Sequence, residues 1–214
     1  MILESAVPMG LTYLDLPTLP VELENSIVEF ALAIPPDEDG RRWIEDFHYN
    51  KLQAVSVVFG RSNTFLPDNI QQQLNNIYSK YLNEPVKGVV GNLNNTQQYP
   101  YACSAPHCDR YRYVSFNYLL RAGGEHVITR FYKQQRGSDD LTSAANLQID
   151  KLEFDTEFCV SERQWHSYNT QYYHSVENIQ TVRLMLVLFP ESNPTVSLFK
   201  QKYSGLIKNL KVAQ

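Results

Sequence analysis

Residues 104–132 read SAPHCDRYRYVSFNYLLRAGGEHVITRFY, and this stretch decides the fold that we expect for the chain. Two runs rich in aromatic and β-branched residues, Tyr111–Leu120 and His126–Lys133, are typical of strands. The segment between them, Arg121–Gly124, ends in two glycines and indicates a turn. The stretch therefore predicts neighbouring short strands, with the tripeptide His-Cys-Asp at positions 107–109 directly before them.

His107 and Asp109 could share a metal ion. Side chains of an extended chain alternate between two faces, so His107 and Asp109 project to one side and Cys108 to the other. An imidazole nitrogen and a carboxylate oxygen from one strand end would then be neighbours. The pattern H-x-D is common by chance, and the alternative is a surface histidine beside an aspartate in a turn.

The composition predicts a single domain with a core rich in strands. The chain has 214 residues, of which 43% are hydrophobic and 20% charged, as in ordinary globular proteins. Its 14 tyrosines favour strands. The net charge of −4 argues against binding to nucleic acid or to an anionic membrane surface.

Cysteine usage and the N-terminus predict the compartment. Cys103, Cys108 and Cys159 form no C-x-x-C pair and are odd in number, which favours a reducing compartment over a disulfide framework. The N-terminal residues lack the pattern of a signal peptide, and no apolar run is long enough to span a bilayer. We therefore expect a cytoplasmic protein with no membrane partner.

The apolar spacing also predicts the other elements. Helices are expected over Val21–Ile34, which Pro35 and Pro36 end, over Pro67–Leu82, and over Val196–Leu210. Further strands are expected over Leu52–Phe59, Lys87–Leu93, Leu152–Val160 and Val182–Phe189, and a polar loop over Gln134–Ala145.

Helices followed by many short strands predict an α+β fold in which the strands form a two-layer sandwich or jelly roll. Within the single domain of residues 1–214 we expect three parts. These are a helix-rich supporting part over residues 1–95, a jelly-roll core with the metal site over residues 96–190, and a C-terminal extension over residues 191–214.

The second half of the chain supplies a third metal ligand. The stretch TQYYHSVENIQTVRLMLVLFP contains His174, followed nine residues later by Arg183 at the start of an apolar strand. Two histidines and one carboxylate leave positions open on one side of a metal, an arrangement typical of non-haem Fe(II) oxygenases. His166 is the alternative third ligand, but no basic residue follows it at that distance.

The order of these motifs resembles a known family. HCD, VSFNYLL, GGEHVITRF, HSVEN and TVRLMLVLF occur in the order and spacing of the iron(II)- and 2-oxoglutarate-dependent dioxygenases, and are most similar to the prolyl-hydroxylase-like branch. The resemblance covers residues 99–189. It implies a double-stranded β-helix core, a cupin-like jelly roll, flanked by helices from the N-terminal half.

The resemblance also implies roles for single residues. His107, Asp109 and His174 would be the catalytic ligands of Fe(II), and Arg183 would pair with the far carboxylate of 2-oxoglutarate, helped by the hydroxyl of Tyr118. Without such a ligand, Arg183 would lie at the wet end of its strand and pair with an ordinary acidic residue. Tyr99 and Tyr101 are both candidates for lining the site.

The implied reaction consumes O2 and 2-oxoglutarate, releases succinate and CO2, and hydroxylates an unactivated carbon of a substrate that the sequence does not identify. A peptidyl or free amino acid is the first hypothesis for that substrate. The alternatives are a non-catalytic jelly-roll domain that binds a ligand or partner, a zinc or manganese hydrolase or isomerase, and a structural jelly roll.

Overall fold

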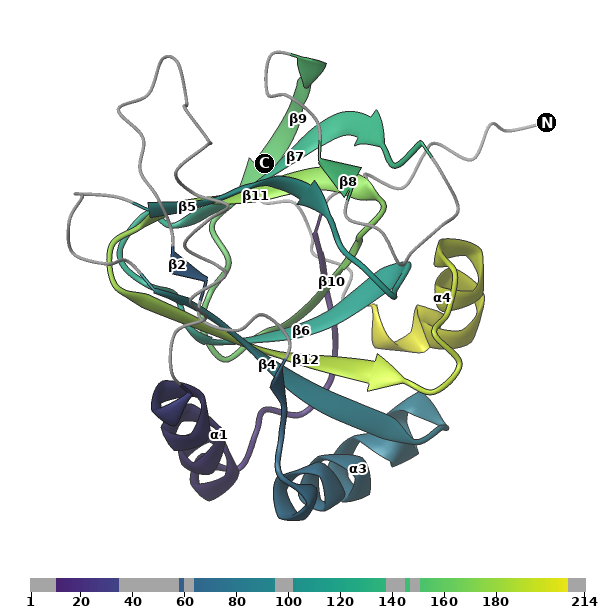
Figure 1. Cartoon of the computed structure of the whole chain (residues 1–214). Coiled ribbons are helices and arrows are strands. Elements are labelled where there is room, and N and C mark those ends of the chain that lie inside the picture. The colour runs from purple at the N-terminus through teal and green to yellow at the C-terminus, as the bar shows by residue number, and fades with distance from the viewer. Residues whose placement is uncertain are drawn as a thin grey trace, which may run out of the picture.

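The computed structural model describes residues 11–34, 58–59, 64–94, 102–137, 145–146 and 151–207. Two antiparallel sheets face each other, and helices lie against the outer face of the larger one (Figure 1). The larger sheet has the order β1-β10-β6-β12-β4-β2, with β3 also paired to β4. The smaller sheet has the order β8-β5-β11-β7-β9.

The strands of the larger sheet are β1 (Thr12–Tyr13), β2 (Val58–Phe59), β3 (Thr64–Phe65), β4 (Val86–Asn94), β6 (Val114–Arg121), β10 (Trp165–Asn169) and β12 (Val182–Pro190). Those of the smaller sheet are β5 (Ala102–Cys108), β7 (Ile128–Gln135), β8 (Ala145–Asn146), β9 (Phe154–Phe158) and β11 (Tyr172–Ile179).

The winding of the chain between the sheets identifies the fold. β4, β5, β6 and β7 fall alternately in the larger and smaller sheets, as do β9, β10, β11 and β12 in the reverse order. The two inner sets, β4-β12-β6-β10 and β5-β11-β7-β9, interleave early and late strands, which is the topology of a jelly roll. The predicted α+β fold with a double-stranded β-helix core is confirmed.

Two helices begin at the predicted residue, and a third begins one residue after the predicted Pro67. The helices are α1 (Val21–Ala33), α3 (Asp68–Leu82) and α4 (Val196–Tyr203), followed by the short 3₁₀ helix η3 (Ser204–Leu206). α4 is shorter than the expected Val196–Leu210 because the chain tightens into η3 after Tyr203. Among the described helices, none is long and apolar enough to cross a membrane.

The main hydrophobic core lies outside the space between the two sheets. Phe116, Tyr118 and Leu186 of the larger sheet pack with Ile27 of α1 and Leu74 of α3, and all five are fully buried. Adjacent residues of a strand point to opposite faces, so the residues between these project toward the smaller sheet. The helices therefore cover one apolar face of the larger sheet and leave its other face for different side chains.

That inner face carries buried polar side chains among apolar ones such as Leu119 and Val187. Tyr168 on β10 contacts His174 and Phe131 of the smaller sheet, which places it between the two sheets. Strand register puts four further buried polar side chains on the same face as Tyr168: Ser115, Asn117, His166 and Arg183. Buried polar groups are costly unless they are hydrogen-bonded, so this group of side chains favours a polar ligand.

Several boundaries differ from the sequence-based expectations. The jelly roll is not confined to residues 96–190, because β4 pairs with β12 along its length and β1 pairs with β10. β6 begins at Val114 instead of Tyr111, which has a left-handed φ of 62° in the preceding turn. No ranges were predicted for β5, β10 and β11, although His107 was expected at a strand end. Of the expected strand Leu52–Phe59, only residues 58–59 lie in the described part.

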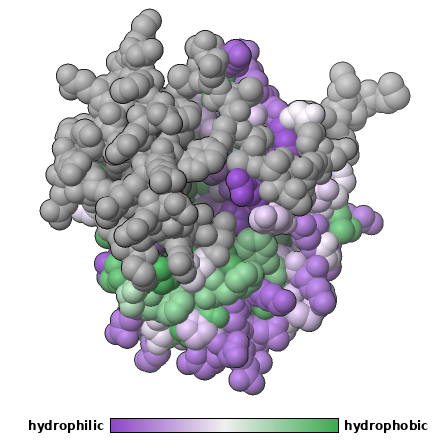
Figure 2. Space-filling view, in the orientation of Figure 1, coloured by the Kyte–Doolittle hydropathy of each residue, from purple (hydrophilic) through white to green (hydrophobic). Residues whose placement is uncertain are grey.

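The exterior of the described part is mostly hydrophilic around the helices, with a hydrophobic band across the face shown in Figure 2. The large apolar side chains with the greatest exposure are Phe65 on β3, Tyr111 before β6 and Val21 at the start of α1. They come from three separate elements of the chain.

Candidate metal centre

The pairing of β5 with β11 brings two histidines together. His107 and His174 are direct partners in the antiparallel register, and their ring centroids lie 4.6 Å apart. Side chains directly opposite each other in an antiparallel pair are close neighbours on the same face. Residues 67 positions apart in sequence therefore present their imidazoles side by side.

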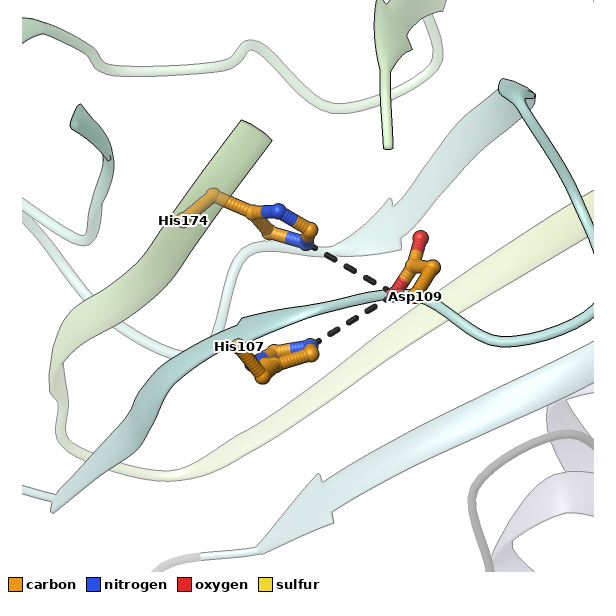
Figure 3. A group of neighbouring side chains, drawn as sticks. All are labelled: His107, Asp109 and His174. Atoms are coloured by element: carbon orange, nitrogen blue, oxygen red, sulfur yellow. Dashed lines mark ion pairs between the residues drawn. The ribbon is translucent and has the colours of Figure 1, made fainter. Parts of the chain in front are cut away.

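Asp109 completes the group from the end of β5. Its Oδ1 lies 3.5 Å from Nε2 of His107 and 3.6 Å from Nε2 of His174 (Figure 3). One ligand atom from each residue lies within 4.8 Å of the other two, so the three side chains could hold a metal ion. The structure thus brings together all three predicted metal ligands.

The orientation of His174 suits a metal ligand. Its Nδ1 lies 3.0 Å from the carbonyl oxygen of Tyr172, so a proton on Nδ1 leaves the lone pair of Nε2 directed at Asp109. The ring is 2% exposed and contacts Phe131 and Tyr168. His107 is more accessible, with 31% of its side chain exposed, so the group has one buried and one open edge.

The carboxylate of Asp109 is held in its charged form. Burial alone would raise its pKa, but the guanidinium of Arg112 and the imidazole of His174 hold the pKa well below its usual range. Arg112 donates from Nε and Nη2 to Oδ2, at 3.0 and 2.6 Å. Arg112 is a residue that the sequence did not single out.

Arg183 lies on the inner face of β12 and is 3% exposed. Its Nη1 donates to the carbonyl oxygen of Ala122 at 3.0 Å, and it forms no ion pair with any carboxylate in the described ranges. Burial lowers its pKa to about 10. The alternative expectation, that Arg183 lies at a solvent-exposed strand end and pairs with an acidic residue, therefore does not hold.

Gly123 makes room for Arg183. It has a φ of +88°, and a Cβ added there would lie 2.8 Å from Cβ of Arg183. The predicted turn at Gly123 and Gly124 is thus also a point of close approach between the β6–β7 turn and β12.

Tyr118 does not lie beside Arg183, and the prediction that it helps bind a cosubstrate is wrong. Its ring packs against Trp165 in the outer core, and its hydroxyl donates to Glu24 at 3.4 Å. The cause is the alternation of β6, which sends Tyr118 outward and Asn117 inward. A different tyrosine, Tyr168, lies between the metal group and Arg183. Burial raises the pKa of its hydroxyl.

The remaining candidates take other places. His166 is buried beside Arg183 rather than at the metal group, and His126, the first residue of the expected strand His126–Lys133, lies instead in an exposed turn with a φ of 59°. Cys108 points outward as predicted, into a cluster with Tyr132 and Tyr173. The side chains of Tyr99, Tyr101, Cys103 and His48 lie outside the described residues.

Three solved structures are similar to this chain. AviO1 from Streptomyces viridochromogenes Tue57 is 13% identical, with a TM-score of 0.45 over 83% of this chain and 89% of that one. The epimerase SnoN in complex with Fe3+, alpha-ketoglutarate and nogalamycin RO is 11% identical, with a TM-score of 0.46 over 85% and 79%. A Pseudomonas putida prolyl-4-hydroxylase is 14% identical, with a TM-score of 0.40 over 84% and 89%.

No protein-family profile and no curated protein matches the sequence. At 11–14% identity and TM-scores of 0.40–0.46, the three solved structures carry no argument about this chain. The chemistry of this chain therefore has to be argued from its own residues.

His166 gives the interior a measurable pH dependence. Burial lowers its pKa to about 3, from 6.5 in an unfolded chain. The unfolded state therefore binds a proton between pH 6.5 and 3 that the folded state does not, so stability is full above pH 6.5 and is lost as the pH falls toward 3. Replacing His166→Gln should flatten the pH dependence of the unfolding free energy by at most about 1.4 kcal/mol per pH unit.

Denaturant unfolding at several pH values measures this slope. His126→Gln is the matched control, since His126 lies in an exposed turn, and it should leave the slope as in the unmodified protein. Equal slopes for His166→Gln and the unmodified protein would show that His166 is not held neutral in the folded state.

Proposed function

We propose that the protein is an Fe(II)- and 2-oxoglutarate-dependent dioxygenase that hydroxylates an unactivated carbon of a small molecule or peptide. The observation that carries the proposal is one polar interior with two complementary features. His107, Asp109 and His174 form a ligand set at one end, and Arg183 supplies a buried cation without an ion pair among the described residues.

The donor set fits iron. It offers two imidazole nitrogens and one carboxylate oxygen and no thiolate, because Cys108 points to the opposite face of β5. Two histidines and one carboxylate on one face of a metal are typical of non-haem Fe(II) oxygenases, since the other positions stay open for substrates. A structural zinc site would instead close its coordination with a fourth protein ligand.

Arg183 fits the far carboxylate of a dicarboxylic oxo acid. A buried charge is costly unless a partner compensates it, and a carboxylate would pair with the guanidinium through two parallel hydrogen bonds. Burial raises the pKa of Tyr168, so its hydroxyl stays protonated and can donate a hydrogen bond to the carboxylate. Burial lowers the pKa of His166, so its ring beside Arg183 stays neutral. Neither side chain is therefore an anion that would pair with Arg183 in place of the carboxylate. The buried Oδ1 of Asn117, which has no hydrogen-bond partner in the described part, further supports a polar ligand on this face.

The bound metal and 2-oxoglutarate would supply the oxidising chemistry, with succinate and CO2 as co-products. The residues of the chain hold and shield these groups. Arg112 keeps Asp109 ionised, the Nδ1 bond fixes the ring of His174, and Phe131 and Tyr168 cover that ring from water. By its resemblance to the prolyl-hydroxylase-like branch, we propose a peptidyl or free amino acid as the substrate.

Anaerobic addition of Fe(II) and then 2-oxoglutarate tests the ligand set. The unmodified protein should develop the weak visible charge-transfer band of the chelate, and under air it should release succinate. Asp109→Ala and His174→Ala should lose both signals, because each removes one of three metal ligands. A zinc hydrolase or a non-catalytic binding domain would give no band, and a band retained in both variants would contradict the proposal.

Arg183 is tested by the affinity for 2-oxoglutarate. Arg183→Met replaces the cation by an apolar side chain of similar length and should weaken the binding of 2-oxoglutarate to the Fe(II) protein about 10- to 100-fold, since a hydrogen bond to a charged group contributes about 1.5–3 kcal/mol. Arg183→Lys should bind 2-oxoglutarate with intermediate affinity, because lysine keeps the charge but cannot donate two parallel hydrogen bonds from a planar group.

Tyr118→Phe is the matched control for this titration. The hydroxyl of Tyr118 faces the helices, so its removal should leave the affinity unchanged. An Arg183→Met variant that binds 2-oxoglutarate as the unmodified protein does would place the carboxylate elsewhere.

A further inference from the structure

The two oxygens of Asp109 have different surroundings. Oδ1 faces the Nε2 atoms of His107 and His174, while Oδ2 accepts both of the hydrogen bonds from Arg112. Hydrogen bonds between a guanidinium and a carboxylate are about twice as strong as neutral ones. One oxygen of the carboxylate, Oδ1, is therefore directed at the two histidines, and the other, Oδ2, is already hydrogen-bonded to Arg112.

Arg112 is held firmly in this position. It is 5% exposed, and its guanidinium carbon lies 5.1 Å from the ring centroid of Phe189. Its carbonyl oxygen accepts hydrogen bonds from Oγ1 of Thr170 and Nε2 of Gln171, at 2.6 and 2.7 Å. The left-handed conformation of Tyr111 turns the chain back, so that Arg112 reaches the carboxylate three residues before it.

The coordination mode of Asp109 determines how many metal positions stay open. A carboxylate binds a metal ion through one oxygen or through both. Two imidazoles and a single carboxylate oxygen leave three positions on an octahedral ion, enough for a chelating oxo acid and one further ligand. If Oδ2 also bound the metal, one of these positions would be lost.

We propose that Arg112 is a positioning residue that restricts Asp109 to bind the metal through Oδ1 alone. This inference rests on the proposed metal binding by His107, Asp109 and His174. Two hydrogen bonds from a fixed, buried guanidinium compete with the metal for Oδ2 and keep the third open position available.

Metal affinity alone would not reveal this role. Removing Arg112 takes away a positive charge near the metal, which favours metal binding, and it also loosens Asp109, which disfavours it. The number of water molecules on the bound metal is the property that the proposal changes. Mn(II) reports this number through the relaxation of water protons, and it needs no turnover.

The experiment compares Mn(II) complexes of the unmodified protein with those of Arg112→Met and Arg112→Lys, each checked for folding by circular dichroism. Arg112→Met should bind Mn(II) and show about a one-third smaller inner-sphere water relaxation, because one of three open positions is filled. With 2-oxoglutarate on the two remaining positions it should keep no inner-sphere water, whereas the unmodified protein should keep one. Arg112→Lys should restore both properties in large part, since its ammonium can still donate to Oδ2.

Arg130→Met is the matched control. Arg130 is also paired with carboxylates, those of Glu157 and Glu177, but it has no contact with Asp109. Its replacement should leave the relaxation unchanged, both before and after 2-oxoglutarate is added. If Arg112→Met does not fold, Arg112→Gln, which removes the charge and leaves a shorter polar side chain, takes its place with the same expected changes.

The outcomes separate the two proposals. Failure of the unmodified protein to bind Mn(II) would overturn the proposed function itself. If the unmodified protein binds Mn(II), an Arg112 variant whose water relaxation is unchanged, both before and after 2-oxoglutarate is added, overturns the positioning role. Loss of Mn(II) binding in a folded Arg112 variant overturns the positioning role as well. Arg112 would then be needed for the metal to bind at all, and not only for Asp109 to bind it through one oxygen.

Discussion

The candidate site depends on the backbone register between β5 and β11. This register sets His107 opposite His174, and a shift by one residue would turn one of the two imidazoles to the other face of the sheet. The pairing becomes irregular directly after His174, so the ladder alone does not fix this position. The turn before β11 fixes it instead, because the carbonyl oxygen of Thr170 accepts from the amide of Asp109 and its hydroxyl donates to the carbonyl of Arg112.

The two faces of the larger sheet have different functions: the outer face stabilises the fold, and the inner face carries the polar side chains of the site. The outer face and the helices bury the large apolar side chains, among them Phe116, Leu186 and Leu74, and contribute most of the hydrophobic stabilisation. The inner face is then free to carry Asn117, His166 and Arg183, which would weaken a core that depended on them. The polar interior is thus consistent with a binding function.

The sequence predicts those features that depend on local alternation and on the order of motifs. His107 and Asp109 share a face because they are two residues apart, and the apolar spacing of Val21–Ala33 and Asp68–Leu82 gives two helices almost to the residue. The bounds of β5 and β11 were not predicted, since their buried polar residues, such as Ser104 and Ser175, hide the alternation of a strand. Their burial comes from tertiary structure, which local sequence does not encode.

The errors at the site have the same origin. Tyr118 was placed beside Arg183 from motif position, whereas the register of β6 with β10 and β12 turns Asn117 to that side. The signal for Tyr168 was present in the alternation of W-H-S-Y, in which Trp165 and Ser167 share one face and His166 and Tyr168 the other. Arg112 could not be found from alternation, because its contact with Asp109 requires the left-handed turn at Tyr111.

A crystal structure of the protein grown without oxygen in the presence of Mn(II) and 2-oxoglutarate tests the central claim most directly. The account predicts one manganese ion bound by Nε2 of His107, Oδ1 of Asp109 and Nε2 of His174, with the far carboxylate of 2-oxoglutarate paired to Arg183. Manganese bound by other residues, or a 2-oxoglutarate carboxylate that does not reach Arg183, would contradict it.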